Sequence, residues 1–266
     1  MFSKPNITIR GAGDIATGVA SRLWRSGFPV IMTEIESPLT VRRTVSFSEA
    51  VYQGSCKVED LEAIRVNNPS DIQSTWNKNK IPILIDPQAQ ISKVLSPEVL
   101  IDAIMAKKNL GTHLQDAPLV IGLGPGFNAG NDVHAVIETK RGHFMGRVIW
   151  EGQPEPDTGI PAEVEGFSQD RVVRSPETGI FQGYCRIGQQ VRENTFLGYV
   201  GESPVLAPIF GVLRGLLHSG VPVKKNMKIG DIDPRRITKH CWTISDKSLA
   251  IGGGVLEAIL SYGPIW

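Results

Sequence analysis

The stretch Ile7-Thr-Ile-Arg-Gly-Ala-Gly-Asp-Ile-Ala-Thr-Gly18 decides the fold prediction. Its β-branched start predicts a strand, and apolar residues then recur at helical spacing up to Gly27. A second apolar run, Phe28-Pro-Val-Ile-Met32, predicts another strand and leads to Glu34. The order strand, Gly-x-Gly-x-x-Ala, helix, strand and acid is typical of a dinucleotide-binding βαβ unit.

The small residues of this stretch have distinct expected roles. Gly11 allows the tight turn, Gly13 lets the backbone approach a phosphate, and Ala16 lets the helix pack on the strand. Glu34 stands where an acceptor for a ribose hydroxyl belongs. Asp14, in the first helical turn, either caps the helix or repels a pyrophosphate. The alternative is that the glycines only serve a tight turn.

Two arginines, Arg42 and Arg43, follow the second predicted strand. The planar guanidinium donates two hydrogen bonds at once to phosphate or carboxylate, so this pair is a candidate anion site. The alternative is a solvated basic turn. Further along the chain, Ile81–Ile85 predicts a buried strand, and residues 97–106 predict a helix with Pro97 in its first turn.

A second glycine-rich loop follows the apolar run 119–121. Gly124 and Gly126 would let its backbone approach a ligand, so we predict that they bind a cofactor. The next segment alternates and predicts a strand with Asp132 and His134 on one face, together with Glu138. Asp132 and His134 are therefore candidate acid/base residues, the alternative being a polar solvent face. This spacing is unspecific for a metal, and we predict none.

Residues 176–200 repeat at 208–232, at an offset of 32 residues, with identical glycines at turn positions. This pattern resembles the biotinyl/lipoyl-type barrel-sandwich hybrid over roughly residues 170–235. The joint between the halves, 201–206, holds no lysine, so we predict no attached biotin or lipoate. Beyond the repeat, Ser245 is a good N-cap for a helix that contains three consecutive glycines, 252–254.

The predicted fold class is therefore α/β, with a Rossmann-like domain and a second, smaller all-β barrel-sandwich-hybrid module. We place the Rossmann-like domain at 1–165, completed by a helix at 243–266, and the module at 166–242. Glycines inside a helix are unfavourable by roughly 1 kcal/mol each relative to alanine, so another element must approach that helix closely.

Composition narrows the function classes. The chain has 266 residues, a net charge of +1, 41% hydrophobic and 21% charged residues. The balanced charge argues against a nucleic-acid binder, and the hydrophobic content argues against disorder. No apolar run is long enough for a membrane span, and the start lacks the pattern of a secretory signal. The three cysteines are far apart, so we expect free thiols in a cytoplasmic protein.

Six motifs carry a resemblance to a known family. They are Ile-Arg-Gly-Ala-Gly-Asp-Ile-Ala-Thr-Gly (9–18), Met-Thr-Glu-Ile-Glu (32–36), Arg-Arg-Thr-Val-Ser-Phe-Ser-Glu-Ala-Val-Tyr (42–52), Ile-Gly-Leu-Gly-Pro-Gly-Phe-Asn-Ala-Gly-Asn-Asp-Val-His-Ala-Val-Ile-Glu-Thr (121–139), Lys-Ile-Gly-Asp-Ile-Asp-Pro-Arg (228–235) and Ile-Gly-Gly-Gly-Val-Leu-Glu-Ala (251–258). The chain resembles the YqeB-type accessory family of the selenium-dependent molybdenum hydroxylase system. Its N-terminal unit is also similar to the Rossmann part of XdhC-like maturation proteins.

The resemblance implies a bacterial cytoplasmic protein that acts beside a xanthine-dehydrogenase-like, selenium-dependent molybdenum hydroxylase. Three functions stay open. The first is a maturation factor that binds a nucleotide, such as NAD(P), or the anionic molybdopterin cofactor, with Arg42 and Arg43 on phosphate. The second is a nucleotide-dependent oxidoreductase or cofactor-modifying enzyme that uses Asp132 and His134 as acid and base. The third is a scaffold without catalytic activity.

Overall fold

A computed structural model describes residues 4–263 and divides into two compact units. Among the described residues, unit 1 holds 4–38, 46–158 and 244–263, and unit 2 holds 39–45 and 159–243. The segment 39–45, which carries Arg42 and Arg43, thus belongs to unit 2, whereas the sequence analysis placed it in the first domain.

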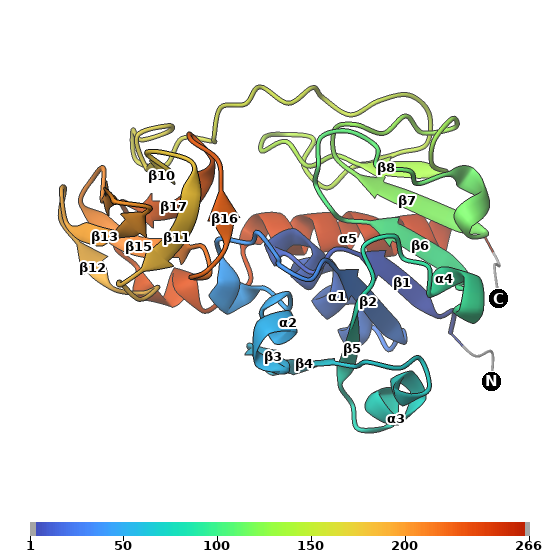
Figure 1. The fold of residues 1–266 in the computed structure, drawn as a ribbon. Helices are drawn as coiled ribbons and strands as arrows, with labels where there is room; N and C mark the ends of the chain where they lie inside the picture. Colours follow the sequence, from blue (N-terminus) through green and yellow to red (C-terminus); the bar gives the residue numbers. More distant parts are fainter. Residues whose placement is uncertain (1–3, 264–266) are drawn as a thin grey trace. The chain divides into compact units, whose positions relative to one another are not determined.

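Among the described residues, unit 1 is built on one nine-stranded sheet (Figure 1). In spatial order its strands are β3 (Ser55–Val58), β4 (Leu61–Arg65), β5 (Ile81–Ile85), β2 (Val30–Glu34), β1 (Ile7–Arg10), β6 (Val99–Asp102), β7 (Leu119–Leu123), β8 (Ala135–Ile137) and β9 (Val148–Ile149). The strands from β4 to β8 are parallel, whereas β3 and β9 run antiparallel at the two edges. The central strands β1, β6 and β7 are buried along their whole length, as parallel strands of this composition usually are.

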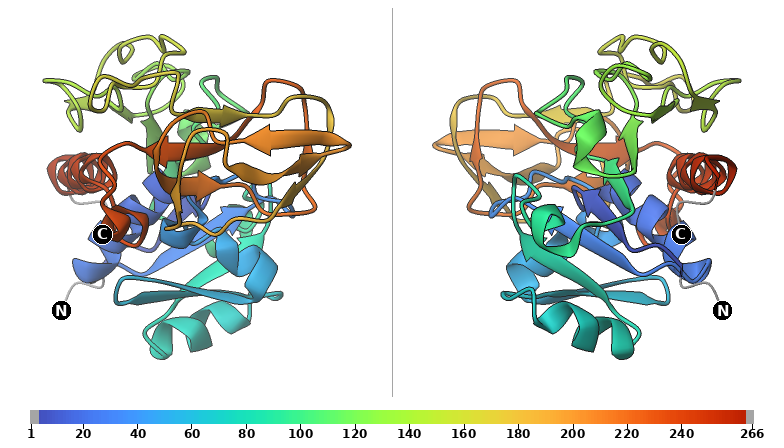
Figure 2. Two further views of the ribbon diagram at one scale, coloured as in Figure 1. Left: turned by 90° about the vertical axis from the view of Figure 1, so that its left-hand side faces the viewer. Right: turned by 90° about the vertical axis from the view of Figure 1, so that its right-hand side faces the viewer.

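Two long helices lie side by side in unit 1, α1 (Asp14–Arg25) and α5 (Asp246–Ser261) (Figures 1 and 2). Helix α1 forms where the apolar spacing predicted it. Helix α5 begins at Ser245, whose side chain accepts a hydrogen bond from the backbone N–H of Ser248 as the predicted N-cap. The shorter helices of the described chain are α2 (Glu49–Gln53), α3 (Asp71–Asn77), α4 (Ser92–Leu95), η1 (Arg43–Val45), η2 (Leu114–Asp116) and η3 (Thr238–Cys241).

The glycine run of α5 is explained by two close approaches. A Cβ added at Gly252 would lie 3.0 Å from the carbonyl oxygen of Gly18 in α1, and one added at Gly254 would overlap the carbonyl oxygen of Gly146. By contrast, a Cβ at Gly253 would meet no atom of the described chain within 4 Å. Two of the three glycines are therefore required by packing, and the third is not.

In unit 2, the described residues form two four-stranded antiparallel sheets. The first contains β10 (Val172–Arg174), β17 (Lys228–Asp233), β15 (Gly211–Leu216) and β12 (Gln190–Val191), and the second β14 (Ser203–Leu206), β13 (Phe196–Val200), β11 (Gly179–Gly183) and β16 (Pro222–Val223). The 32-residue offset relates β11 to β15, β12 to β16 and β13 to β17. Because β12 pairs with β15, and β16 with β11, each sheet takes one strand from the other half of the repeat.

The predicted fold class is wrong. The sheet of unit 1 is mixed, with antiparallel strands at both edges. The described connections from β6 to β7 and from β7 to β8 contain η2 and turns but no α-helix, so the regular alternation of a Rossmann-like domain is missing there. The all-β part consists of two separate sheets, and no observation identifies it as a barrel-sandwich hybrid.

The predicted helix at 97–106 is also wrong, because its apolar residues form strand β6 between β1 and β7. A short apolar run has no periodicity that separates a buried strand from a helix.

Within residues 4–263, no helix is long and apolar enough to cross a membrane.

Candidate functional site

The first glycine loop, between β1 and α1, is held by the protein's own groups. Gly11 has a φ of +94°, and a Cβ there would lie 3.0 Å from the carbonyl oxygen of Ala103. The Glu34 carboxylate accepts hydrogen bonds from the backbone N–H of Ala12 at 2.9 Å and of Ile35 at 2.8 Å. Burial raises the pKa of Glu34 above its usual range, although these two bonds oppose that rise. Glu34 therefore ties the end of β2 to this loop.

The other predicted residues of this loop lie at the start of α1. Gly13 is the N-cap residue, with no side-chain cap, and Ala16 is fully buried in the first turn. The packing role predicted for Ala16 agrees with this burial. Binding of a nucleotide by Gly11, Gly13 and Glu34 stays a prediction.

The second glycine loop is also closely packed by protein atoms. Gly124 and Gly126 have φ values of +72° and +108°, which favour glycine. A Cβ at Gly124 would overlap the hydroxyl of Thr139, and one at Gly126 would lie 2.5 Å from the backbone nitrogen of Lys108. The close approach that these glycines permit is made by the chain itself. The contact of Gly124 and Gly126 with a cofactor stays a prediction.

The candidate acid and base, Asp132 and His134, each bind a backbone N–H. Asp132 accepts from Asn128 at 3.0 Å inside the turn, and His134 Nδ1 accepts from Val120 at 2.9 Å. The predicted strand over 132–138 is shorter than expected, because only the three residues of β8 are paired. Asp132 thus lies in a turn rather than on a strand face with His134. An acid/base role for the two residues stays a prediction.

We expect His134 to stay neutral at physiological pH. Burial lowers its pKa below the usual 6.5, and its Nδ1 can accept from Val120 only without a proton. A histidine with a depressed folded-state pKa contributes stability above its unfolded pKa, and this is lost as the pH falls through the folded value. An NMR titration of the imidazole should therefore give a midpoint below 6.5. A midpoint above 6.5 would contradict the geometry.

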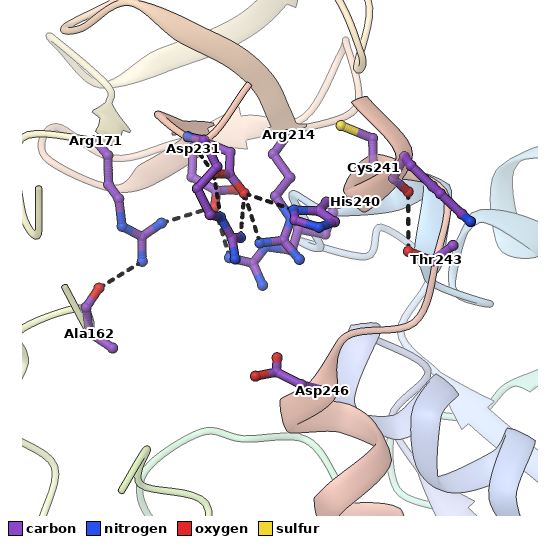
Figure 3. A network of polar contacts seen from close by, with 12 residues as sticks. Ala162, Arg171, Arg214, Asp231, His240, Cys241, Thr243 and Asp246 are labelled. Atoms are coloured by element: carbon purple, nitrogen blue, oxygen red, sulfur yellow. Dashed lines mark hydrogen bonds and ion pairs between the residues drawn. The ribbon is translucent and has the colours of Figure 1, made fainter. Parts of the chain in front are cut away.

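The predicted anion-binding arginines lead to a different group of residues, all in unit 2. We call it the arginine cluster and define it by Arg42, Arg171, Arg214, Arg235, Asp231, Asp233 and His240. Figure 3 shows Arg171 reaching the carboxylate of Asp231, with Arg214 and His240 beside it. Arg43 lies outside this cluster and donates from Nε to the carbonyl oxygen of Leu216 at 2.8 Å.

Asp231, on β17, is the buried centre of the arginine cluster. Its side chain is fully buried, and Oδ2 accepts from Arg42 at 2.8 Å and from Arg171 at 3.3 Å. Burial alone would raise the pKa of Asp231, but the charges of Arg42, Lys228 and Arg171 hold this pKa well below its usual range. Asp231 is therefore ionised and joins three separate segments of unit 2.

Asp233 continues the cluster two residues later, on the same face of β17. Its carboxylate accepts from Arg214 at 3.2 Å and from both Nε and Nη2 of Arg235, at 2.9 and 2.6 Å. The Nδ1 atom of His240 lies 3.8 Å away. Both oxygens of Asp233 are thus used to orient guanidinium groups.

The cluster joins four arginines to two aspartates. The Nε atoms of Arg171 and Arg214 are buried and have no hydrogen-bond partner among residues 4–263. The same holds for Oδ1 of Asp231 and Nδ1 of His240. The pKa of Arg214 is lowered by burial and, to a smaller extent, by repulsion from Arg42. Burial also lowers the pKa of Arg171, although the charge of Asp231 opposes this change. Buried polar atoms without a partner are rare and call for an explanation, of which a bound water or ion is one.

Sequence reasoning found only Arg42 of this cluster. A signal for the rest existed in Asp231-Ile-Asp233-Pro-Arg235, where two acids alternate at strand spacing before an arginine. The position of Arg214 follows from pairing between β15 and β17, which places its neighbour Gly215 opposite Asp231. Arg171 precedes β10, which pairs with β17 on its other side, and this long-range pairing has no local signal.

Comparisons with known proteins give one similar sequence of note. No family model matches the chain. It is 45% identical over 254 residues to the uncharacterised protein YqeB of Escherichia coli K12. This match supports the family label inferred from the motifs. It covers 96% of this chain but 47% of that protein, so the chain spans about half the length of its curated relative.

Solved structures give weak similarities only. A succinylglutamate desuccinylase/aspartoacylase from Rhodobacter sphaeroides has 16% identity and a TM-score of 0.26, over 86% of this chain and 85% of that chain. An aspartoacylase family protein from Mesorhizobium loti has 11% identity and a TM-score of 0.27, over 87% and 85%. Neither is a Rossmann or molybdenum-related protein, contrary to our expectation. TM-scores this low do not support any inference about the function of this chain.

Proposed function

We propose that this protein binds a small anionic ligand at the arginine cluster and acts as a ligand-binding accessory protein. The observation that carries the proposal is the pair of buried Nε donors on Arg171 and Arg214, which have no hydrogen-bond partner among residues 4–263. Guanidinium groups bind phosphate and carboxylate through paired hydrogen bonds, and the two aspartates already fix their orientation. Arg235 keeps 33% of its side chain exposed, so the cluster reaches solvent.

The partner and the larger process remain predictions from the motif resemblance. They are a cytoplasmic location and an accessory role beside a selenium-dependent molybdenum hydroxylase, with a nucleotide or the anionic molybdopterin cofactor as the ligand. No nucleic acid or membrane is expected as a partner. A pull-down with the hydroxylase tests the role, and a thermal-shift panel with nucleotides and a molybdopterin source tests the ligand.

Anion binding itself is tested by a thermal-shift series with sulfate and inorganic phosphate at constant ionic strength. A ligand at ~100 times its dissociation constant stabilises the folded state by about 2.7 kcal/mol. In a chain of this size, that should raise the midpoint by roughly 5–10 °C. Arg171→Gln should weaken the binding at least about tenfold, because a buried donor and a charge are lost.

Arg174→Gln is the matched control. Arg174 lies three residues away on β10, is exposed, and donates to the carbonyl oxygen of Asn226 outside the arginine cluster. Its replacement should leave the anion response unchanged. An equal loss in both variants, or no response of the unsubstituted protein to any anion, would contradict the proposed function.

A further inference from the structure

One face of the sheet β14-β13-β11-β16 of unit 2 is apolar and exposed to solvent. Five large side chains on its strands or directly after them are 37–69% exposed, namely Ile180, Tyr184, Phe196, Tyr199 and Leu206. We call this set the aromatic face. Intervening residues of the same strands point to the other side and are at most 2% exposed, namely Phe181, Leu197 and Val205. The exposure therefore belongs to one side of the sheet.

The side chains of the aromatic face contact one another across the strands. The ring centroid of Tyr199 lies 4.7 Å from that of Phe196 and 6.2 Å from that of Tyr184. Leu206 lies opposite Phe196 in the pairing of β14 with β13. Apolar residues scattered singly over a surface need no explanation, whereas a contiguous patch marks an interaction site. The aromatic face is such a patch.

The internal repeat shows the same positions in a covered state. The offset of 32 residues relates Tyr184 to Leu216, and Tyr199 to Asp231, in the first sheet of unit 2. Leu216 and Asp231 are at most 1% exposed, whereas Tyr184 and Tyr199 are 69% and 41% exposed. The two halves of the repeat thus differ in whether equivalent positions are covered.

A short segment of the chain, 39–45, provides part of the cover of the first sheet. The backbone N–H of Leu216 donates to the carbonyl oxygen of Val41 at 2.8 Å, and Arg42 pairs with Asp231. The exposed fractions show that no part of residues 4–263 covers the aromatic face in this way. That place is left to a partner from outside the chain.

The border of the aromatic face carries charges of both signs. At the end of the sheet where β13 turns into β14, the Asp, Glu, Lys and Arg residues within four positions of the strand ends are Glu177, Glu202, Lys224 and Lys225. At the opposite end they are Arg186, Arg192 and Glu193, so this end is net positive. The two glutamates of the first end lie on the side of β14, and its two lysines on the side of β16.

A two-fold rotation brings opposite charges together at this border. If the axis runs across the strands, Glu202 of one copy faces the end of the other copy that holds Arg186 and Arg192. If the axis runs along the strands, Glu202 faces the side that holds Lys224 and Lys225. Either orientation places the acidic corner on a net positive one, so a second copy of the chain is complementary in charge.

The area of the aromatic face also suits a second copy. A large side chain exposes about 200 Å² when fully accessible, so the exposed fractions of the five residues correspond to roughly 500 Å² per copy. Two copies together would bury about 1,000 Å² from these side chains, which is close to the lower limit for a specific interface. Such an area favours a reversible dimer over a permanent one.

We infer that a second copy of this chain covers the aromatic face, so that the two sheets β14-β13-β11-β16 pack against each other about a two-fold axis. In a two-fold dimer the same patch serves both copies and must match itself, as this apolar face with oppositely charged borders does. Sheets pack face to face through their apolar sides in β-sandwiches, and aromatic rings add edge-to-face and offset-stacked contacts. The dimer does not depend on the anion site.

Sedimentation velocity of the full chain over a range of concentrations tests this inference. We expect the weight-average mass to rise with concentration from that of one chain toward that of two. Tyr184→Ser should raise the dissociation constant at least about tenfold, because an aromatic anchor of the interface is lost. The substitution should leave the fold intact, since Tyr184 is 69% exposed.

Phe144→Ser is the matched control, because Phe144 is 46% exposed but lies in unit 1, where its ring contacts Arg147. It should leave the dissociation constant unchanged. Glu202→Lys, as a second variant, brings like charges together in both orientations. It should raise the dissociation constant by about two- to fivefold at low ionic strength.

Three results would overturn the inference. The first is the mass of one chain at every concentration. The second is a dimer that Tyr184→Ser and Phe144→Ser weaken equally, because the interface would then lie elsewhere. The third is a monomeric chain whose capture of the hydroxylase is weakened by Tyr184→Ser, because the aromatic face would then bind that partner. The anion titrations are read separately and are not affected by these results.

Discussion

Replacing Asp231 with asparagine should destabilise unit 2 by about 3–5 kcal/mol, because it removes the buried carboxylate that pairs with the buried guanidinium of Arg171 and the partly buried one of Arg42. The substitution conserves shape, so the effect reports charge and not a cavity. Hydrogen exchange measured by mass spectrometry should show lost protection in β15 and β17. Urea unfolding should show a lower midpoint.

A matched control for this substitution is Asp157→Asn in unit 1. Asp157 pairs with Lys107 at 2.6 Å, but the two side chains are 37% and 57% exposed. Exposed ion pairs contribute less than about 1 kcal/mol, so the control should change little. An Asp231→Asn variant as stable as Asp157→Asn would show that Asp231 does not hold the arginine cluster together.

Acid should have the same effect on the cluster as this substitution. The folded-state pKa of Asp231 is depressed, so the stability it contributes is present above the ordinary aspartate pKa of about 4. This contribution is lost as the pH falls through the folded value. Hydrogen-exchange protection of β15 and β17 should therefore decline below about pH 4 in the unsubstituted protein, and less so in Asp231→Asn.

The second large effect is expected in α5, where adjacent glycines should respond to alanine in opposite directions. Gly254→Ala places a methyl group on the carbonyl oxygen of Gly146 and 3.0 Å from Cγ2 of Ile137. Such overpacking typically destabilises by about 1–3 kcal/mol. Gly253→Ala meets no described atom within 4 Å and should stabilise the helix by up to about 1 kcal/mol.

Thermal unfolding of both variants against the unsubstituted protein checks this prediction. Both substitutions add the same methyl group to the same helix, so helix propensity cancels in the comparison. A decreased midpoint for Gly254→Ala beside an increased one for Gly253→Ala is the expected result. Midpoints that shift in the same direction would show that α5 does not pack against Gly146 as described.

Local patterns predicted single elements well. Strand β1, helix α1 and strand β2 lie where alternation, helical spacing and Gly27 placed them, and Ser245 caps α5. These features depend on residues close in sequence, whose propensities and capping preferences act locally. Strand β6 was predicted as a helix, because its burial depends on partners from β1 and β7 that a local window does not contain.

The candidate site was less predictable than the strands. The motif Gly11-x-Gly13 predicts a phosphate loop, which stays a prediction, but it did not reveal that the Glu34 carboxylate accepts from the N–H of Ala12. A motif does not reveal which group of the chain takes its hydrogen bonds. Arg42 was found because arginine pairs suit anions, yet its partner Asp231 is 189 residues away. Pairs so distant in sequence are brought together only by the tertiary fold.

The discontinuity of unit 1 has a consequence for synthesis. Helix α5, which packs beside α1, leaves the ribosome only after both segments of unit 2 have been made. Until then, the surface of α1 around Gly18 lacks its covering helix, and closing so long a segment of chain carries an entropic cost. Nascent chains that expose apolar surface depend on chaperones. The growing polypeptide should therefore bind chaperones while unit 2 is being translated, and release them once α5 has emerged.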